Sequence, residues 1–184
     1  MGRKKKTNEI EIKPKTESII SYSGGATIKI MKNGKVRRTI QQHNEGSNYL
    51  FSFLTQCLAG NFYKVNRPQL VRVGNYSSET FTEYSLSYVR VSTSRAYTKD
   101  GNEVVDFSFN FPGTLINIPT DADSTTGLNC LRIYSDTNAT DISKYSAQII
   151  LTGDDIITSL TKEESLLIIW EMQIESINTQ GGNE

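Results

Sequence analysis

Hydrophobic and polar residues alternate in many short segments of this chain, which is the pattern of β-strands that bury one face. The alternation is clearest over residues 26–31, where Ala, Ile and Ile occupy the even-numbered positions. Asn33-Gly34 then reverses the chain into residues 36–41. Because a type I′ turn needs positive φ at both central residues, Asn-Gly between two such segments is a strong hairpin signal. We therefore predict a β-hairpin over residues 26–41.

The strand pattern continues through the rest of the chain, with Gly and Asn at the turns. Over residues 166–174 the even positions are all apolar and include Trp170, whereas Glu171, Gln173 and Glu175 occupy the other face. This period of two predicts a strand rather than a helix, central in its sheet and with Trp170 buried. Together with this strand, the predicted strands are 69–73, 85–92, 104–111, 114–118, 128–134 and 145–152. Their spacing predicts a mainly β fold, an antiparallel β-sandwich or jelly-roll-like domain.

One segment has the period of a helix instead. Its apolar residues recur at the i, i+3, i+4, i+7 and i+8 positions of an amphipathic helix, predicted near residues 47–59. They are Leu50, Phe53, Leu54, Cys57 and Leu58. Phe51 widens the apolar face, so we expect the helix to be covered on more than one side, by its own sheet or by a neighbouring subunit.

Charge is balanced overall, with 20 basic and 20 acidic residues, but the two ends of the chain differ. Residues 1–15 contain six basic and two acidic residues, a net charge of +4, and residues 154–184 contain one basic and seven acidic residues, a net charge of −6. The segment 1–16 has too few apolar residues to fold alone, so we expect a flexible basic arm. The predicted organisation is this arm, a single β domain over residues 17–177 and a polar tail over residues 178–184.

Few residues suggest catalysis or metal binding. His43 is the only histidine, which excludes a histidine cluster for zinc, and we expect it to bond locally. Cys57 and Cys130 are predicted to be buried free thiols. The acidic loop 121–127 lacks the glycine and the glutamate of a calcium-binding EF-hand, so it reads as a solvated turn. We therefore predict no enzyme activity, no cofactor and no metal site.

Two short patches carry a resemblance. Residues 43–54, with the sequence HNEGSNYLFSFL, and the following residues 57–60, CLAG, resemble a stretch in virion proteins of gut tailed phages. Residues 166–171, LLIIWE, resemble the closing strand of the same kind of protein. The resemblance implies a structural protein of a tailed phage, of the crAss-like kind, in the capsid, the collar or the tail. It implies synthesis in the host bacterial cytoplasm and residence in the virion.

Such a protein acts through repeated subunit interfaces, so the expected partners are copies of itself and other virion proteins. The candidate assembly contacts are Arg3, Lys4, Lys5, Lys6, Leu50, Phe51, Phe53 and Leu54. Contact of the basic arm with DNA is the less favoured reading, and neither a membrane segment nor a small-molecule substrate is predicted.

Two alternatives from other classes stay open. One is a carbohydrate- or receptor-binding module, because tyrosine-rich loops of a β-sandwich suit sugars. The tyrosines that suggest it are Tyr22, Tyr63, Tyr76, Tyr84, Tyr88, Tyr97, Tyr134 and Tyr145. The other is a small hydrolase, which a pair of carboxylates in a cleft would favour.

Overall fold

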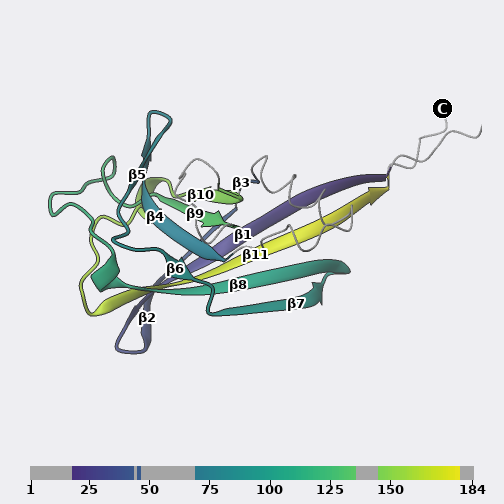
Figure 1. Ribbon diagram of the computed structural model, residues 1–184, viewed down its shortest axis with the longest axis horizontal. Helices are drawn as coiled ribbons and strands as arrows, with labels where there is room; N and C mark the ends of the chain where they lie inside the picture. Colours follow the sequence, from purple (N-terminus) through teal and green to yellow (C-terminus); the bar gives the residue numbers. More distant parts are fainter. Residues whose placement is uncertain (1–17, 44, 47–68, 136–144, 179–184) are drawn as a thin grey trace, which may run out of the picture.

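The computed structural model describes residues 18–43, 45–46, 69–135 and 145–178 (Figure 1). The predicted basic arm, the predicted helix near residues 47–59 and all but the first residue of the predicted tail lie outside these ranges. They stay predictions, and no α-helix occurs within the described ranges.

The described residues form two antiparallel sheets. The five-stranded sheet has the order β2 (Lys35–His43), β1 (Ser18–Lys32), β11 (Glu164–Asn178), β8 (Asn102–Pro112) and β7 (Thr93–Lys99). The other sheet has the order β3 (Glu45–Gly46), β10 (Ala147–Ile150), β9 (Cys130–Tyr134), β4 (Leu70–Ser77) and β5 (Thr80–Glu83), and β6 (Val89–Arg90) also pairs with β4. Two short 3₁₀ helices, η2 (Gly113–Leu115) and η3 (Gly153–Asp155), complete the described elements. The prediction of a mainly β, antiparallel fold is confirmed.

One hydrophobic core lies between the sheets. Side chains such as Ile28, Phe109 and Trp170 enter it from the five-stranded sheet, and Val73 and Ile133 enter it from the six-stranded sheet. The buried side chains alternate along these strands, as the sequence pattern predicted: Ala26, Ile28 and Ile30 of β1, Phe107, Phe109 and Phe111 of β8, and Leu166, Ile168, Trp170 and Met172 of β11 face this core. Burial of each large apolar side chain contributes about 1.5–3 kcal/mol, so this shared core is what holds the two sheets together.

The predicted hairpin is present as β1 and β2. Asn33 and Gly34 have φ values of 50° and 73°, the two positive angles that a type I′ turn needs. The register between the strands shifts by one residue beside Ile30, because Arg37 is an extra residue in β2. This β-bulge sets β2 so that Ile40 lies opposite Ile28 and enters the core.

The prediction that residues 166–174 form a central strand is also confirmed. This segment belongs to β11, which is the third of the five strands in its sheet and pairs with β1 on one side and β8 on the other. Trp170 has 0% of its surface exposed. The backbone groups of this strand are paired on both edges, and its buried side chains from Leu166 to Met172 enter the core.

Two of the predicted strands are wrong. Of residues 85–92, only Val89 and Arg90 form a strand, β6. Of residues 114–118, the first two belong to the 3₁₀ helix η2. A single isolated bridge joins Ser85 to Ile116. At Gly113 the chain passes close to the segment that leads into β11: a Cβ atom at Gly113 would lie 2.3 Å from the carbonyl oxygen of Thr161 and 2.6 Å from that of Glu164. Val89, Val91, Leu115 and Ile118 pack against the core from its border and Ile116 is buried in it, whereas Leu86 is 68% exposed.

Three strands were not predicted, β3, β5 and β7. β7 has the sequence TSRAYTK, with few apolar residues, because it is an edge strand and most of it is exposed. Its turn to β8 is formed by Asp100 and Gly101, both with positive φ. Asp-Gly is a hairpin signal as clear as Asn33-Gly34 and could have located β7 in the sequence.

Candidate functional site

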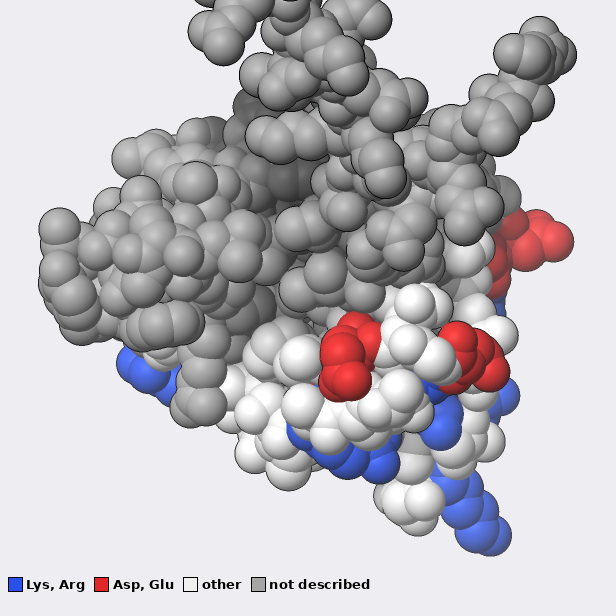
Figure 2. All heavy atoms as spheres, turned by 90° about the vertical axis from the view of Figure 1, so that its right-hand side faces the viewer, with Lys and Arg blue, Asp and Glu red and all other residues white. Residues whose placement is uncertain are grey.

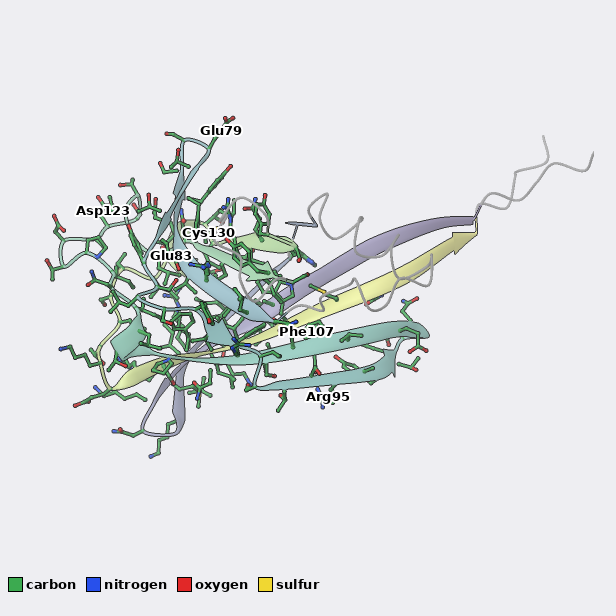
Figure 3. All side chains as sticks on the ribbon, viewed as in Figure 1. Glu79, Glu83, Arg95, Phe107, Asp123 and Cys130 are labelled. Atoms are coloured by element: carbon green, nitrogen blue, oxygen red, sulfur yellow. The ribbon has the colours of Figure 1, made fainter. Side chains whose placement is uncertain are left out.

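The outer face of the five-stranded sheet carries a connected set of polar side chains on β7, β8 and β11. Arg95 of β7 donates two hydrogen bonds to Asp106 Oδ2 of β8, at 3.1 and 2.5 Å. The Tyr97 hydroxyl donates to Glu171 Oε1 of β11 at 2.6 Å, and Lys99 Nζ lies 3.5 Å from Glu171 Oε2. In Figure 3, Arg95 on β7 and Phe107 on β8 lie on opposite sides of this sheet, Phe107 in the core and Arg95 toward solvent.

Asp106 and Glu171 are directly opposite each other across β8 and β11. Two carboxylates in this position would repel each other if both were unpaired. Here each has a cation of its own, Arg95 for Asp106 and Lys99 for Glu171. The hydrogen bond to Glu171 also raises the pKa of Tyr97 to about 12, so Tyr97 stays a donor at neutral pH. The arrangement is a neutral network that ties three strands together, and it does not single out one carboxylate as an acid or a base.

A groove of about 520 Å³ lies beside this network and crosses the five-stranded sheet. Its lining comes from both edge strands and from the strands between them. The lining includes Gly24, Gly25, Thr27, His43, Lys99 and Glu171. Gly24 and Gly25 have no side chain to fill it, and a Cβ atom at Gly25 would lie 2.8 Å from the Gln42 carbonyl oxygen. The lining mixes polar side chains and paired charges with apolar surface from Ala26 and Val104, which suits a ligand rich in hydroxyl groups better than an ion.

The most prominent feature of the outline is the ribbon formed by β1 and β11 (Figure 1). The two strands pair without interruption from Lys32 opposite Glu164 to Ser18 opposite Asn178. β2 pairs with β1 only as far as Gly25, and β8 pairs with β11 only as far as Ile174. The ribbon therefore continues past its neighbours, and both ends of the described chain leave from its tip.

The end of the molecule at which the ribbon terminates shows mixed charge. Figure 2 looks onto this end, and acidic and basic side chains lie near one another over its described surface. A broad single-sign field of the kind that attracts nucleic acid is therefore not seen on the described part of this view.

The outer face of the six-stranded sheet holds a cluster that the sequence analysis did not predict. Arg72 of β4 and Arg132 of β9 lie opposite each other in register. The Arg132 guanidinium lies 4.4 Å from the ring centre of Phe81 and 4.3 Å from that of Tyr145. Arg72 bonds both carboxylate oxygens of Glu83, at 2.8 and 2.7 Å. Aromatic rings stabilise Arg132 and a carboxylate stabilises Arg72. No local sequence motif predicts this structural role.

Most of the described tyrosines are buried or contact other residues of the chain. Tyr134 is fully buried, the hydroxyl groups of Tyr84 and Tyr97 bond Thr126 and Glu171, and Tyr145 stacks on Arg132. Among the described tyrosines Tyr88 is the one with a large exposed fraction, at 36%. The tyrosine count therefore supports a sugar-binding surface less than the sequence suggested.

The residues considered for chemistry in the sequence have the following positions. His43 is exposed at the end of β2 and lines the groove, while its neighbour Asn44 lies outside the described residues. Cys130 is a buried free thiol, as predicted, and Cys57 lies outside the described ranges. The loop 121–127 is a turn as expected: Asp123 Oδ1 accepts hydrogen bonds from Thr125 and Thr126, which lower the pKa of Asp123 far below its usual range.

The predicted assembly contacts, Arg3, Lys4, Lys5, Lys6, Leu50, Phe51, Phe53 and Leu54, all lie outside the described residues. Within the described ranges, no group of three or more His, Cys, Asp and Glu side chains is placed to hold a metal ion. The same ranges contain no helix with the length and hydropathy needed to cross a membrane.

Comparison with known proteins gave no match: no protein-family model, curated protein or solved structure is significantly similar to this chain.

Proposed function

We propose that this chain is a structural subunit of a tailed-phage virion, in the capsid, the collar or the tail. The observation that carries the proposal is the β1–β11 ribbon, which among the described residues extends past its neighbouring strands and brings both ends of the described chain to one tip. A projecting pair of strands is suited to contact a neighbouring subunit by strand addition.

Charge and sequence give further support. The two segments that continue from the ribbon tip begin at residues 17 and 179, and the chain carries +4 over residues 1–15 and −6 over residues 154–184. Ends of opposite charge allow head-to-tail contacts between copies. The patch 166–171, which resembles the closing strand of phage virion proteins, lies in β11, the central strand of the ribbon sheet.

On this proposal the protein is not an enzyme and needs no cofactor. Its partners are copies of itself and other virion proteins, it is made in the host bacterial cytoplasm, and it resides in the virion. The neutral network around Asp106 and Glu171 then stabilises the pairing of β7, β8 and β11 within each subunit.

The test is direct. Peptides of this chain should be found by mass spectrometry in density-banded tailed particles released by the cells that make it, at a constant copy number per particle. If the protein were abundant in the same lysate but missing from the banded particles, the proposal would be wrong.

A second candidate function is supported by the groove beside the Tyr97–Glu171 pair, whose mixed polar and apolar lining and volume of about 520 Å³ suit a saccharide. In this case the chain is a carbohydrate- or receptor-binding module. A glycan array with the full chain separates the two: binding that is lost on Lys99→Ala but kept on Lys35→Ala, a lysine at the β1–β2 turn, would favour the module.

A further inference from the structure

The segment that joins the two sheets after β5 has one face toward the core and one toward solvent. Residues 85–92 pass from the six-stranded sheet, where β6 pairs with β4, to the five-stranded sheet, where the Ser92 N–H donates to the Ser108 carbonyl oxygen at 2.8 Å. Figure 1 shows β6 between β4 and β8. Val89 and Val91 pack against the core. Because successive side chains of an extended chain point to opposite sides, the residues that alternate with these valines point outward.

The outward side of this segment carries two large apolar side chains. Leu86 is 68% exposed and Tyr88 is 36% exposed. Among the described residues one other large apolar side chain is exposed, Val36 in the β1–β2 hairpin. Single exposed apolar residues are normal on a protein surface, but two at alternate positions of one segment form a patch. Arg90, the next outward residue, is exposed as well, and these three residues are called the Leu86–Arg90 patch below.

The patch is held in place by contacts within the chain. The Leu86 N–H donates to the Leu115 carbonyl oxygen at 2.8 Å. The centre of the Tyr88 ring lies 5.6 Å from the guanidinium carbon of Arg90 and 6.0 Å from that of Arg72, which is fixed by its ion pair. Such distances allow cation–π attraction. A partner therefore meets an ordered patch, which reduces the conformational entropy lost on binding.

The charge of the patch indicates what a partner must supply. Among the described residues, no carboxylate lies within ion-pair distance of Arg90. A protein that covers Leu86 and Tyr88 also removes water from the neighbouring guanidinium, and an unpaired charge in that position opposes binding. The partner must therefore place a carboxylate beside Arg90. Tyrosine and arginine are also the residues most enriched among those that dominate the binding energy of protein interfaces.

We propose that the Leu86–Arg90 patch binds a different protein, which presents an apolar side chain to Leu86 and Tyr88 and a carboxylate to Arg90. The inference rests on the proposed virion function, under which the partner is another component of the particle, and it names the chemistry of that partner. The described surface of a second copy does not match this chemistry. Its remaining exposed apolar side chain, Val36, follows the exposed residue Lys35, and a lysine repels Arg90.

Site-specific photocrosslinking tests the partner. The full-length chain, with p-benzoylphenylalanine in place of Leu86, is made in the cells that release the tailed particles and is irradiated there. We expect a crosslink to one other protein, at a site with an aspartate or glutamate close by. The matched control carries the same photoreactive residue at Val36, which is also apolar and exposed, and should give no crosslink to that protein. No crosslink from position 86, or crosslinks only to nucleic acid or to copies of this chain, would show that the inference is wrong.

Charge exchange then tests the contact of Arg90. In the chain with the photoreactive residue at position 86, Arg90→Glu places like charges opposite each other and should lower the crosslink yield by about tenfold or more. Changing the acidic residue identified on the partner to lysine should restore the yield, and this recovery also shows that the Arg90→Glu protein is folded. A yield that Arg90→Glu leaves unchanged would contradict the proposed carboxylate contact.

The results separate this inference from the proposed function. If the protein were present in density-banded particles but position 86 gave no crosslink to another protein, the interface would be wrong and the virion function would stand. If the crosslink and its charge dependence were found in the cells but the protein were missing from the particles, the interface would stand and the virion function would fall.

Discussion

Trp170 of β11 lies directly opposite Phe107 of β8, and both side chains enter the core between the two sheets. Trp170 is the only tryptophan of the chain, so its fluorescence reports on this position alone. We expect blue-shifted emission that iodide does not quench in the folded protein and that shifts to the red on unfolding. Emission of water-exposed indole from the folded protein would show that the core is not packed as described.

The same residue gives a prediction on stability. Trp170 Nε1 is buried and has no hydrogen-bond partner among the described residues, and such a donor costs free energy. Trp170→Phe removes the orphan N–H and keeps a ring in place, so it should destabilise less than Trp170→Ala, for which about 3–5 kcal/mol is expected. Urea unfolding of both variants measures the difference, and a loss on Trp170→Phe as large as that on Trp170→Ala would contradict this expectation.

The β4–β5 turn stores strain that a glycine should relieve. Ser78 and Glu79 have φ values of 49° and 62°, which only glycine adopts without cost. Glu79→Gly should raise the free energy of unfolding, by less than about 1 kcal/mol because glycine also adds entropy to the unfolded chain. Thr80→Gly, in the adjacent strand β5, is the control and should destabilise the protein. A loss of stability on Glu79→Gly would mean that the side chain makes a contact that outweighs the strain.

The strands that the sequence predicted correctly are those whose side chains enter the shared core. Residues 107–111 of β8 and 170–173 of β11 alternate between apolar and polar because one face of each strand meets the other sheet. β7 was missed since an edge strand needs little apolar surface, and residues 85–92 were overpredicted because apolar residues at the border of the core do not require a strand.

The outer faces could be predicted less well than the core. Asp106 and Glu171 are 65 positions apart in the sequence, and only the β8–β11 register brings them together with Arg95 and Lys99. The extension of the β1–β11 ribbon past β2 could not be predicted either, since it depends on where β2 stops pairing. Such features arise from tertiary pairing rather than from local pattern.

Glu164 should make stability depend on acid. Its pKa is lowered, chiefly because Oε2 accepts a hydrogen bond from the Thr161 N–H at 2.8 Å and further because of Arg37. A lowered folded-state pKa stabilises the protein above the unfolded value of about 4.3, and this contribution is lost as the pH falls through the folded-state pKa. The difference in unfolding free energy between wild type and Glu164→Gln should therefore be constant near neutral pH and vanish in acid. The control is Glu163→Gln, an exposed neighbour paired with Lys32, for which the difference should be small throughout. A difference at Glu164 that persisted unchanged in acid would exclude a role for its charge.

Cys130 should be inert in the folded protein. Its side chain is fully buried, and burial raises the pKa of the thiol to about 12. Because the thiolate is the reactive form, a thiol reagent at mildly alkaline pH should not modify Cys130 in a Cys57→Ser protein until denaturant is added. Rapid modification of the native protein would show that β9 opens readily or that its outer face is accessible.

The central claim is that this chain is built to assemble, and sedimentation velocity of the full-length protein tests it most directly. At about 0.1 M salt we expect a discrete oligomer with a mass that is a multiple of 20.6 kDa. Because exposed charge pairs are screened as the Debye length falls from about 10 Å to about 3 Å, the association should weaken at about 1 M salt. Protein lacking residues 1–15 should remain folded, associate more weakly and depend less on salt, since its +4 charge is gone. A full-length chain that sedimented as a 20.6 kDa monomer at every concentration and salt would contradict the account.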